Sequence, residues 1–299
     1  MGLEGMLVYS ENGLVDPWLV SQMLIQATDR ISPLVAVQPV YMHPYTVAKM
    51  IASLAHLHGR RTCVNLVAGG FRNDLAALGD ETPHDERYAR LTDYGGLIKA
   101  LTHETIPVTS RSSHYSVDEL RLTPPVPPEL QPEFMISGSS AAGLRAARAL
   151  EATALRYPQP PGEEEPQSET GLRTGIRIGI IARESSEEAW RIGLEKFPED
   201  RAGQITHRLA MTVSDSEWHR QLSRLAEAAA ARESPYWLGP FQNYRTYCPY
   251  LVGTHAEVAE QLSGYLSRGH DTFILDVPSS REDLEHAAMA FGDAVGMAA

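Results

Sequence analysis

The sequence predicts an α/β fold of the (β/α)8-barrel type, of the kind named after triosephosphate isomerase (TIM). Short apolar runs alternate with amphipathic helical stretches along most of the 299 residues. The apolar runs are continuous, which is typical of strands that are covered on both faces. The number of strand–helix units favours a closed barrel of parallel strands.

Seven strands are expected from these apolar runs. They are Gly5–Tyr9, Leu34–Gln38, Cys63–Ala68, Phe134–Gly138, Ala152–Tyr157, Gly175–Ala182 and Thr272–Val277. A barrel of this type needs eight strands, and the chain opens only a few residues before its first strand. We therefore expect the first strand and helix of the barrel to be missing at the N-terminus. A late start site, a truncated chain or an open barrel would each explain this, although an open barrel exposes two strand edges.

Amphipathic helices are expected between the strands. The stretch from Pro44 to Leu57 places Val47, Ile51 and Leu54 at helical spacing. Similar patterns predict helices over His84–Leu101, Ser139–Leu150, Ser185–Leu194 and His255–Arg268.

We expect one barrel domain over residues 1–299, with excursions at 106–133 and 197–233. The first excursion is rich in proline and includes a stretch that fits a short hairpin. The second contains two helical pieces. The segment Pro158–Gly171 stands where a barrel helix is expected, but it has the composition of a solvated loop.

The amino-acid composition limits the classes of partner that the protein is expected to bind. The formal net charge is −12 and the 26 Lys and Arg residues form no long run, which argues against nucleic acid or an anionic membrane surface. The N-terminus carries neither a basic segment nor a long apolar one, so we expect no signal peptide, no membrane span and a cytoplasmic location. The two cysteines show no metal-ligand spacing, and no metal site is expected.

The strand ends should carry the chemistry, because barrels of this type react at the carboxyl ends of their strands. These ends are rich in small, hydroxyl and amide residues and poor in paired carboxylates. Such strand ends are poorly suited to hydrolysis by a pair of carboxylic acids, and they are well suited to holding a cofactor. One of them, Gly138-Ser139-Ser140, lies between an apolar strand and a helix. It is either a place where an anion meets free backbone N–H groups or a simple helix cap.

Other residues at strand ends allow two interpretations each. Asn65 either faces the edge of a heterocycle or is a buried amide satisfied by backbone. Gly69-Gly70 either permits a close backbone approach or makes a plain turn. Tyr88, one turn into the helix that opens with "HDERY", either reaches a phosphate or belongs to a solvated helix start.

Two basic side chains are also candidates. Arg177 lies inside an apolar strand, where an arginine must be paired or face a cavity, and we expect it to face the barrel mouth. His43 precedes Pro44 at a helix start and is either structural or in contact with ligand.

Taken together, several motifs resemble the bacterial-luciferase-like flavin monooxygenases, and within them the alkanesulfonate monooxygenase branch. The motifs are "PVYMHPYTVAKMIASLAHLHGRR", "NLVAGGFRNDL", "HDERYARLTDY", "FMISGSSAAGL" and "GIRIGIIARESSEEAW". They occur in the family's order and spread over nearly the whole chain.

The resemblance implies a barrel that binds FMN, used in its reduced form as a cosubstrate with oxygen. It places the flavin phosphate on Gly138, Ser139 and Ser140, beside the helix start that carries His84 and Tyr88. It places the isoalloxazine ring against four further residues: Asn65, Ala68, Gly69 and Gly70. The resemblance also implies a separate flavin reductase and a homodimer or homotetramer.

Within this resemblance, Arg177 is expected to orient an anionic group of the substrate or to stabilise negative charge that develops during oxidation. His43 is the second catalytic candidate. Tyr9 and Tyr41 are candidates for the wall of the substrate pocket.

The chain also departs from the sulfonate enzymes. They carry a histidine two residues after the arginine, where this chain has Gly179. A cysteine and a tyrosine of that branch are replaced, approximately at Leu14 and Val277. Alkanesulfonate is therefore not the expected substrate.

The sequence thus predicts an FMN-dependent monooxygenase that oxidises a small organic substrate, which could be tethered to a carrier protein. Two alternatives stay open: an oxidoreductase that uses a deazaflavin, and a catalytically degenerate barrel that only binds flavin.

Overall fold

The computed structural model describes residues 2–69, 71–163, 171–213, 222–225 and 234–298. The chain divides into two compact units, an N-terminal unit of residues 3–154 and a C-terminal unit of residues 155–299, which also takes in residues 1 and 2. The expectation of one domain over the whole chain stays a prediction.

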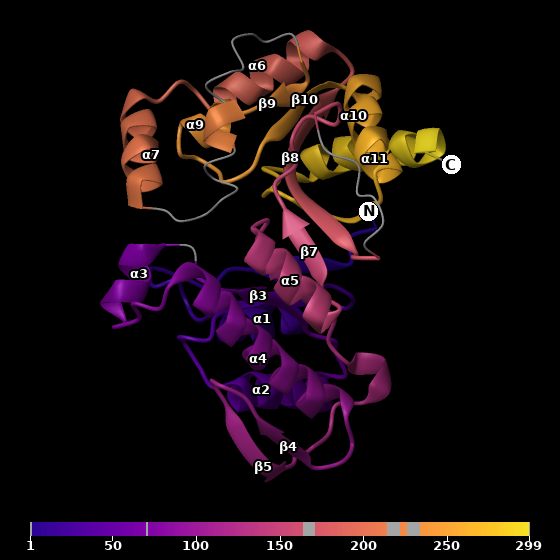
Figure 1. The fold of residues 1–299 in the computed structure, drawn as a ribbon. Helices are drawn as coiled ribbons and strands as arrows, with labels where there is room; N and C mark the ends of the chain where they lie inside the picture. The colour runs from indigo at the N-terminus through magenta and orange to yellow at the C-terminus, as the bar shows by residue number, and fades with distance from the viewer. Residues whose placement is uncertain (1, 70, 164–170, 214–221, 226–233, 299) are drawn as a thin grey trace. The chain divides into compact units, whose positions relative to one another are not determined.

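The N-terminal unit is built on a parallel sheet. Strands β1 (Gly5–Val8), β2 (Ser32–Val37), β3 (Cys63–Val67) and β6 (Phe134–Ser137) pair in this order, and β7 (Thr153–Arg156) comes next in the sheet. Parallel pairing requires crossover connections, which helices supply here. They are α1 (Pro17–Ala27), α2 (Pro44–His58), α4 (His84–His103) and α5 (Ala141–Leu150), with the short α3 (Arg72–Ala77) before α4 (Figure 1).

Local sequence sets the ends of these helices. Helix α2 begins with Pro44 directly after His43, whose side chain accepts a hydrogen bond from the Tyr45 N–H, and it ends at Gly59, with φ +60°. The 20-residue α4 packs on α2 and α5. Its Gly95 lies against the sheet, where a Cβ atom would come within 2.7 Å of both Leu66 and Leu150.

The excursion at 106–133 forms the hairpin that the sequence predicts. Strands β4 (Val108–Arg111) and β5 (Ser116–Leu120) pair antiparallel as a sheet of their own. His114 in the connecting turn contacts Asp93 of α4 at 2.7 Å, which anchors the hairpin to that helix. A short 3-10 helix, Pro128–Leu130, leads back to the main sheet.

The C-terminal unit is organised around β8 (Thr174–Arg183). The first half of β8 pairs parallel with β11 (His270–Leu275), and the second half pairs parallel with β10 (Tyr250–Thr254). The two-residue β9 (Tyr236–Trp237) pairs antiparallel with β10. Helices α6 (Ser186–Lys196), α10 (His255–Ser267) and α11 (Arg281–Ala298) pack on these strands, as Figure 1 shows.

Alternate residues of β8 face opposite sides, as in any strand. Ile176, Ile178 and Ala182 belong to a core cluster with residues of α10 and α11. The opposite face presents Gly175, Arg177 and Gly179, a large side chain between two residues that have none.

The structure confirms the seven expected strands and the hairpin, and it adds β9 and β10. Strand β10 escaped the sequence analysis because it is a five-residue stretch that follows Pro249 and contains Gly253. In the second excursion, α7 (Arg201–Val213) confirms the first helical piece. The second piece lies largely outside the described residues, and a short α9 (Gly239–Gln242) follows.

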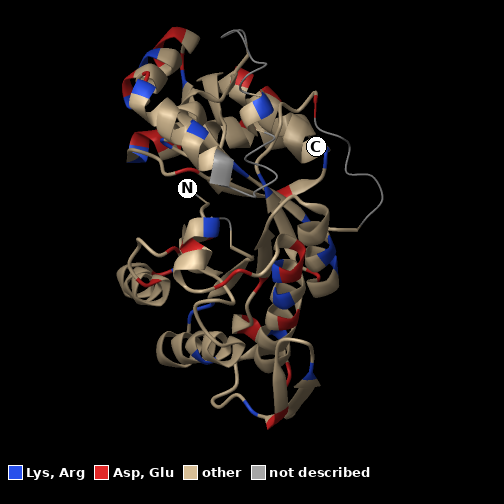
Figure 2. Cartoon of the chain, turned by 60° about the vertical axis from the view of Figure 1, so that its left-hand side comes forward, with Lys and Arg blue, Asp and Glu red and all other residues tan. Residues whose placement is uncertain are grey.

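Charged residues of both signs are interspersed along the chain in both units, as the colouring of Figure 2 shows. This distribution fits the absence of a long basic run in the sequence. Among the helices of the described part of the chain, none is long and apolar enough to cross a membrane.

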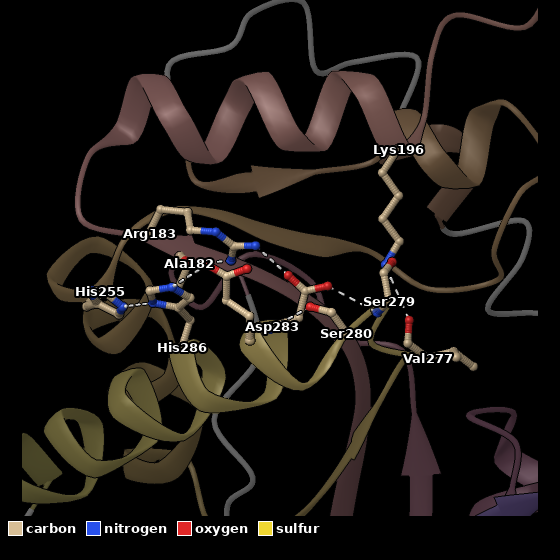
Figure 3. A network of polar contacts seen from close by, with 10 residues as sticks. Ala182, Arg183, Lys196, His255, Val277, Ser279, Ser280, Asp283 and His286 are labelled. Carbon is tan, nitrogen blue, oxygen red and sulfur yellow. Dashed lines mark hydrogen bonds and ion pairs between the residues drawn. The ribbon is translucent and has the colours of Figure 1, made fainter.

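An ion pair joins α11 to β8. The Arg183 guanidinium donates to the Asp283 carboxylate, and both side chains are at least nine-tenths buried. Asp283 also accepts a hydrogen bond from the Ser279 N–H at 3.0 Å, and its own N–H donates to the Ser280 hydroxyl at 3.1 Å. Figure 3 shows this network at the start of α11, with the Lys196 ammonium 3.3 Å from the Val277 carbonyl oxygen.

The contact between α4 and the sheet gives a first prediction. Gly95→Val is expected to lower the free energy of unfolding by about 1–3 kcal/mol, because the new side chain overpacks against Leu66 and Leu150. Gly96 is the matched control, since a Cβ atom there lies 3.8 Å from Leu150 and meets no other atom. Gly96→Ala should raise stability by up to about 1 kcal/mol. Urea unfolding monitored by circular dichroism measures the stability of both variants. Equal changes in stability would contradict the close packing of Gly95 against Leu66 and Leu150.

The buried ion pair gives a second prediction. Burial alone would raise the pKa of Asp283, but Arg183 and the Ser279 N–H hold it below the ordinary 3.8. A lowered carboxyl pKa adds stability above the ordinary pKa, and this stability is lost as the pH falls through the lowered value. Asp283→Asn should therefore cost of order 3 kcal/mol at pH 7, and the difference from the wild type should shrink below pH 3.8. A constant difference over the acid range, measured by thermal unfolding, would refute this.

Candidate functional site

The turn after β6 requires a glycine. Gly138 has φ +153°, and a Cβ atom added there would lie 2.1 Å from the Tyr88 hydroxyl oxygen. The Tyr88 hydroxyl donates to the Ser137 carbonyl oxygen at 3.4 Å. A tyrosine from α4 thus fills the space that a side chain at position 138 would occupy.

The two serines of this turn have different surroundings. Ser140 is the N-cap of α5, and its hydroxyl accepts a hydrogen bond from the Gly143 N–H at 3.2 Å. The Ser139 hydroxyl oxygen is buried and has no hydrogen-bond partner among the described residues. The first turn of α5 contains no acidic residue. The helix cap and the anion site are therefore compatible: Ser140 serves the first, and Ser139 leaves a polar atom available beside a helix N-terminus.

Asn65 lies in the middle of β3 rather than at the strand end where the sequence suggested it, and its side chain reaches this turn. Its side-chain oxygen accepts a hydrogen bond from the Ser137 hydroxyl at 3.0 Å, and the residue is 3% exposed. Tyr88 is also buried, and the His84 ring meets its ring edge-on at 5.1 Å between centroids. The structure thus brings together Asn65, the start of α4 and the turn from Ser137 to Ser140.

The turn after β3 is only partly described. Ala68 is buried, and Gly69 has φ +96° with the Leu75 side chain 2.9 Å from an added Cβ atom. Gly70 lies outside the described residues. The Gly69 carbonyl oxygen accepts a hydrogen bond from Arg87 at 3.4 Å.

A cavity of about 250 Å³ lies between α3 and the start of α4. Side chains of both charges line it, so its wall does not favour one ligand charge: Arg72, Leu75, Ala76, Asp80, Glu81, Thr82, Pro83, His84 and Arg87.

The other candidates of the N-terminal unit have local structural partners. His43 caps α2 and its ring contacts that of Tyr115 at 5.7 Å between centroids. Tyr41 donates to the side-chain oxygen of Asn12 at 2.7 Å, and burial, followed by nearby acidic groups, raises its pKa. Tyr9 is 39% exposed. A catalytic role for His43 and a pocket role for Tyr9 and Tyr41 stay predictions.

In the C-terminal unit, Arg177 is paired. Its Nη2 lies 2.6 Å from Oδ1 of Asp276, the residue directly after β11, and both side chains are about nine-tenths buried. The other carboxylate oxygen of Asp276 accepts hydrogen bonds from the Thr246 and Tyr250 hydroxyls, each at 2.8 Å. The aspartate is therefore fixed by three side chains from two other segments of the chain.

The acid–base properties of this cluster follow from its geometry. Burial alone would raise the pKa of Asp276, but the Arg177 charge and the three hydrogen bonds outweigh it and hold the pKa below its ordinary value. Burial, and next the Asp276 charge, raises the pKa of Tyr250. The fully buried Cys248 thiol has its pKa raised to about 12. At neutral pH this cluster therefore contains a carboxylate, a guanidinium, a neutral phenol and a neutral thiol.

The missing histidine at position 179 has a structural counterpart. A Cβ atom added at Gly179 would lie 2.3 Å from the ring of Tyr250, so the tyrosine occupies the space of a side chain there. The register pairs these two residues directly across β8 and β10. A polar tyrosine hydroxyl held by Asp276 thus lies beside the position where the sulfonate branch has its histidine.

Asp276, Tyr250 and Thr246 are absent from the sequence-based candidates. One signal for Asp276 was present, because an arginine inside an apolar strand needs a buried anion and Asp276 directly follows the last apolar strand. Nothing in the sequence pattern pointed to Tyr250 or Thr246.

Comparison with known proteins agrees with this architecture. Residues 1–272 match the family model described as luciferase-like monooxygenase. A monooxygenase of Niallia circulans that acts on 4-(gamma-L-glutamylamino)butanoyl-[BtrI acyl-carrier protein] is 33% identical over 291 residues, which are 95% of this chain and 85% of that protein.

Two solved structures show the fold. An EDTA monooxygenase from Chelativorans sp. BNC1 superposes with a TM-score of 0.73 at 16% identity, covering 99% of this chain and 82% of that one. A riboflavin lyase, solved with modified FMN and riboflavin, gives a TM-score of 0.70 at 19% identity, covering 95% and 75%. The fold is therefore the predicted TIM-type barrel fold, and the chain belongs to the luciferase-like monooxygenase family.

Proposed function

We propose that this protein is an FMN-dependent monooxygenase that uses reduced FMN and oxygen to oxidise a small organic substrate. The observation that carries the cofactor assignment is the buried Ser139 hydroxyl, which has no partner among the described residues and lies at the N-terminus of α5. A buried polar atom without a partner is costly, and a phosphate oxygen would satisfy it.

The residues around this hydroxyl fit a phosphate. Gly138 lets the backbone approach closely, and the free N–H groups and dipole of α5 favour a negative charge. Ser140 keeps the first turn of the helix ordered through its cap. Tyr88 supports the turn from below by its contact with the Ser137 carbonyl. We assign Gly138, Ser139, Ser140 and Tyr88 to the phosphate, and His84 to the same region.

Asn65 is assigned to the flavin ring, together with Ala68, Gly69 and Gly70. The hydrogen bond from Ser137 fixes the orientation of the Asn65 amide, so its remaining polar atoms would meet the edge of the ring in one arrangement. Reduced FMN, when bound, supplies the electrons that reduce oxygen, with one oxygen atom entering the product and the other leaving as water.

The substrate is assigned to the cluster around Arg177. Its guanidinium is held at one oxygen of Asp276, which fixes the direction of its remaining N–H donors. The Tyr250 hydroxyl keeps its proton at neutral pH and donates a hydrogen bond to Asp276. These groups orient a polar substrate atom by hydrogen bonding.

An acyl group tethered to a carrier protein is the substrate class we favour. The relative from Niallia circulans acts on such a substrate, and its similarity extends over 95% of this chain. The replacement of the sulfonate-handling residues at Leu14, Gly179 and Val277 fits a change of substrate. A separate flavin reductase, a homodimer or homotetramer and a cytoplasmic location belong to the same proposal.

The cofactor assignment predicts the effect of one substitution. Ser139→Ala should weaken the binding of reduced FMN roughly tenfold to a hundredfold, because a hydrogen bond to a charged group contributes about 1.5–3 kcal/mol. Ser53→Ala is the control, since the Ser53 hydroxyl donates only to the Lys49 carbonyl within α2. Anaerobic fluorescence titration measures both. Equal affinities of Ser139→Ala and the wild type for reduced FMN would contradict the assignment of the phosphate to this turn.

The function is tested by mixing the chain anaerobically with reduced FMN and then with oxygen-18, in the presence of short acyl thioesters. Incorporation of one labelled oxygen atom into a thioester, seen by mass spectrometry, is the expected result. Binding of a deazaflavin in place of FMN would favour a hydride-transferring oxidoreductase. Tight FMN binding without labelled product from any substrate would favour a degenerate flavin-binding barrel.

A further inference from the structure

The positive charge of Arg177 is balanced within the protein. Its Nη2 lies 2.6 Å from the Asp276 carboxylate, and the side chains are 12% and 10% exposed. Such a pair has no net charge, so it attracts an approaching anion far less than an isolated guanidinium would. An anionic group that contacted Arg177 would also lie close to the Asp276 carboxylate and be repelled by it.

A second cation, Lys196, lies beside this cluster. The Lys196 ammonium donates to the Val277 carbonyl oxygen at 3.3 Å and lies over the rings of Phe197 and Tyr250, at 5.3 and 5.6 Å from their centroids. The third cation of this unit's polar network, Arg183, is paired with Asp283. Arg177 is the cation that hydrogen-bonds to Asp276 in the cluster with Tyr250 and Thr246.

The hydrogen bonds of Asp276 hold its carboxylate beside Arg177, so the two charges stay paired. Its Oδ2 accepts from two hydroxyls at 2.8 Å while its Oδ1 accepts from Arg177, so the carboxylate is held in one position. One segment of the chain, residues 246–250, supplies both hydroxyls, and β8 supplies the arginine. The carboxylate therefore cannot swing away from Arg177 without losing three hydrogen bonds.

We propose that Asp276 determines substrate specificity: it cancels the charge of Arg177, so that the site rejects small anionic substrates and accepts a neutral polar group such as an acyl thioester or amide. This inference rests on the proposed function in one respect, namely that Arg177 contacts the substrate. It names the class of substrate group that the cluster takes, and it accounts for an arginine retained from the sulfonate branch in a site that does not bind a sulfonate.

The test is a gain of anion binding on removal of the carboxylate. Asp276→Asn keeps the shape and the hydrogen-bond acceptor but leaves the Arg177 charge without this partner. Calorimetric titration with butanesulfonate, without flavin, should show at least about tenfold tighter binding than to the wild type. Titration with butanamide should show no such gain, because the probe is neutral.

Asp283→Asn is the matched control. It removes the carboxylate of the other buried Arg–Asp pair of β8, six residues further along the strand at Arg183. It should lower stability but leave butanesulfonate binding unchanged. Asp276→Ser, which also removes the charge, serves as the second variant if the asparagine variant does not fold.

Unchanged butanesulfonate binding in folded Asp276→Asn or Asp276→Ser would overturn the proposal, and so would an equal gain in Asp283→Asn. The titration needs neither FMN nor oxygen, so its outcome is independent of the oxygen-18 experiment. A gain of anion binding in a chain that incorporates no oxygen would leave the charge balance established and the monooxygenase assignment wrong.

Discussion

The C-terminal unit depends on the pairing of one strand, β8, with both β11 and β10. Its ten residues pair with β11 along the first half and with β10 along the second. Side chains of both neighbours crowd β8, with Thr272 atoms 2.8 Å from a Cβ at Gly175 and the Tyr250 ring 2.3 Å from a Cβ at Gly179. Only residues without a side chain fit at these two positions, and the Arg177 side chain lies between them.

A comparable constraint acts in the N-terminal unit. Tyr88 fits between Gly138 and Gly143, where Cβ atoms would lie 2.1 Å from its hydroxyl oxygen and 3.2 Å from its ring. Two positions without side chains thus allow a large one to support the turn from behind. The same absence of side chains is what the proposed phosphate site requires of the turn. Packing and ligand binding would both require glycine and small residues at this turn. The sequence alone therefore could not distinguish a helix cap from an anion-binding turn.

The fold was largely predictable because buried parallel strands are continuous apolar runs and their helices keep a 3.6-residue period. The position of Ser139 and Ser140 followed from the same break between strand and helix. The partner of Arg177 did not, because Asp276 lies 99 residues away and reaches it only through the register of β8 and β11. The interpretation of Gly179 as a simple loss was likewise incomplete, since the ring that fills its place comes from β10, a strand too short and too interrupted to be found by periodicity.

Under the proposed specificity, the pairing of Arg177 with Asp276 also favours one order of substitutions at these two positions over the other. Loss of the arginine first would leave a buried carboxylate facing two hydroxyls, a state with a high cost in stability. Loss of the aspartate first would also leave a buried charge, but this cation could be neutralised by an anionic substrate. A lineage that changes between neutral and anionic substrates would therefore vary position 276 while keeping the arginine, and the substrate itself would take over the role of the missing carboxylate.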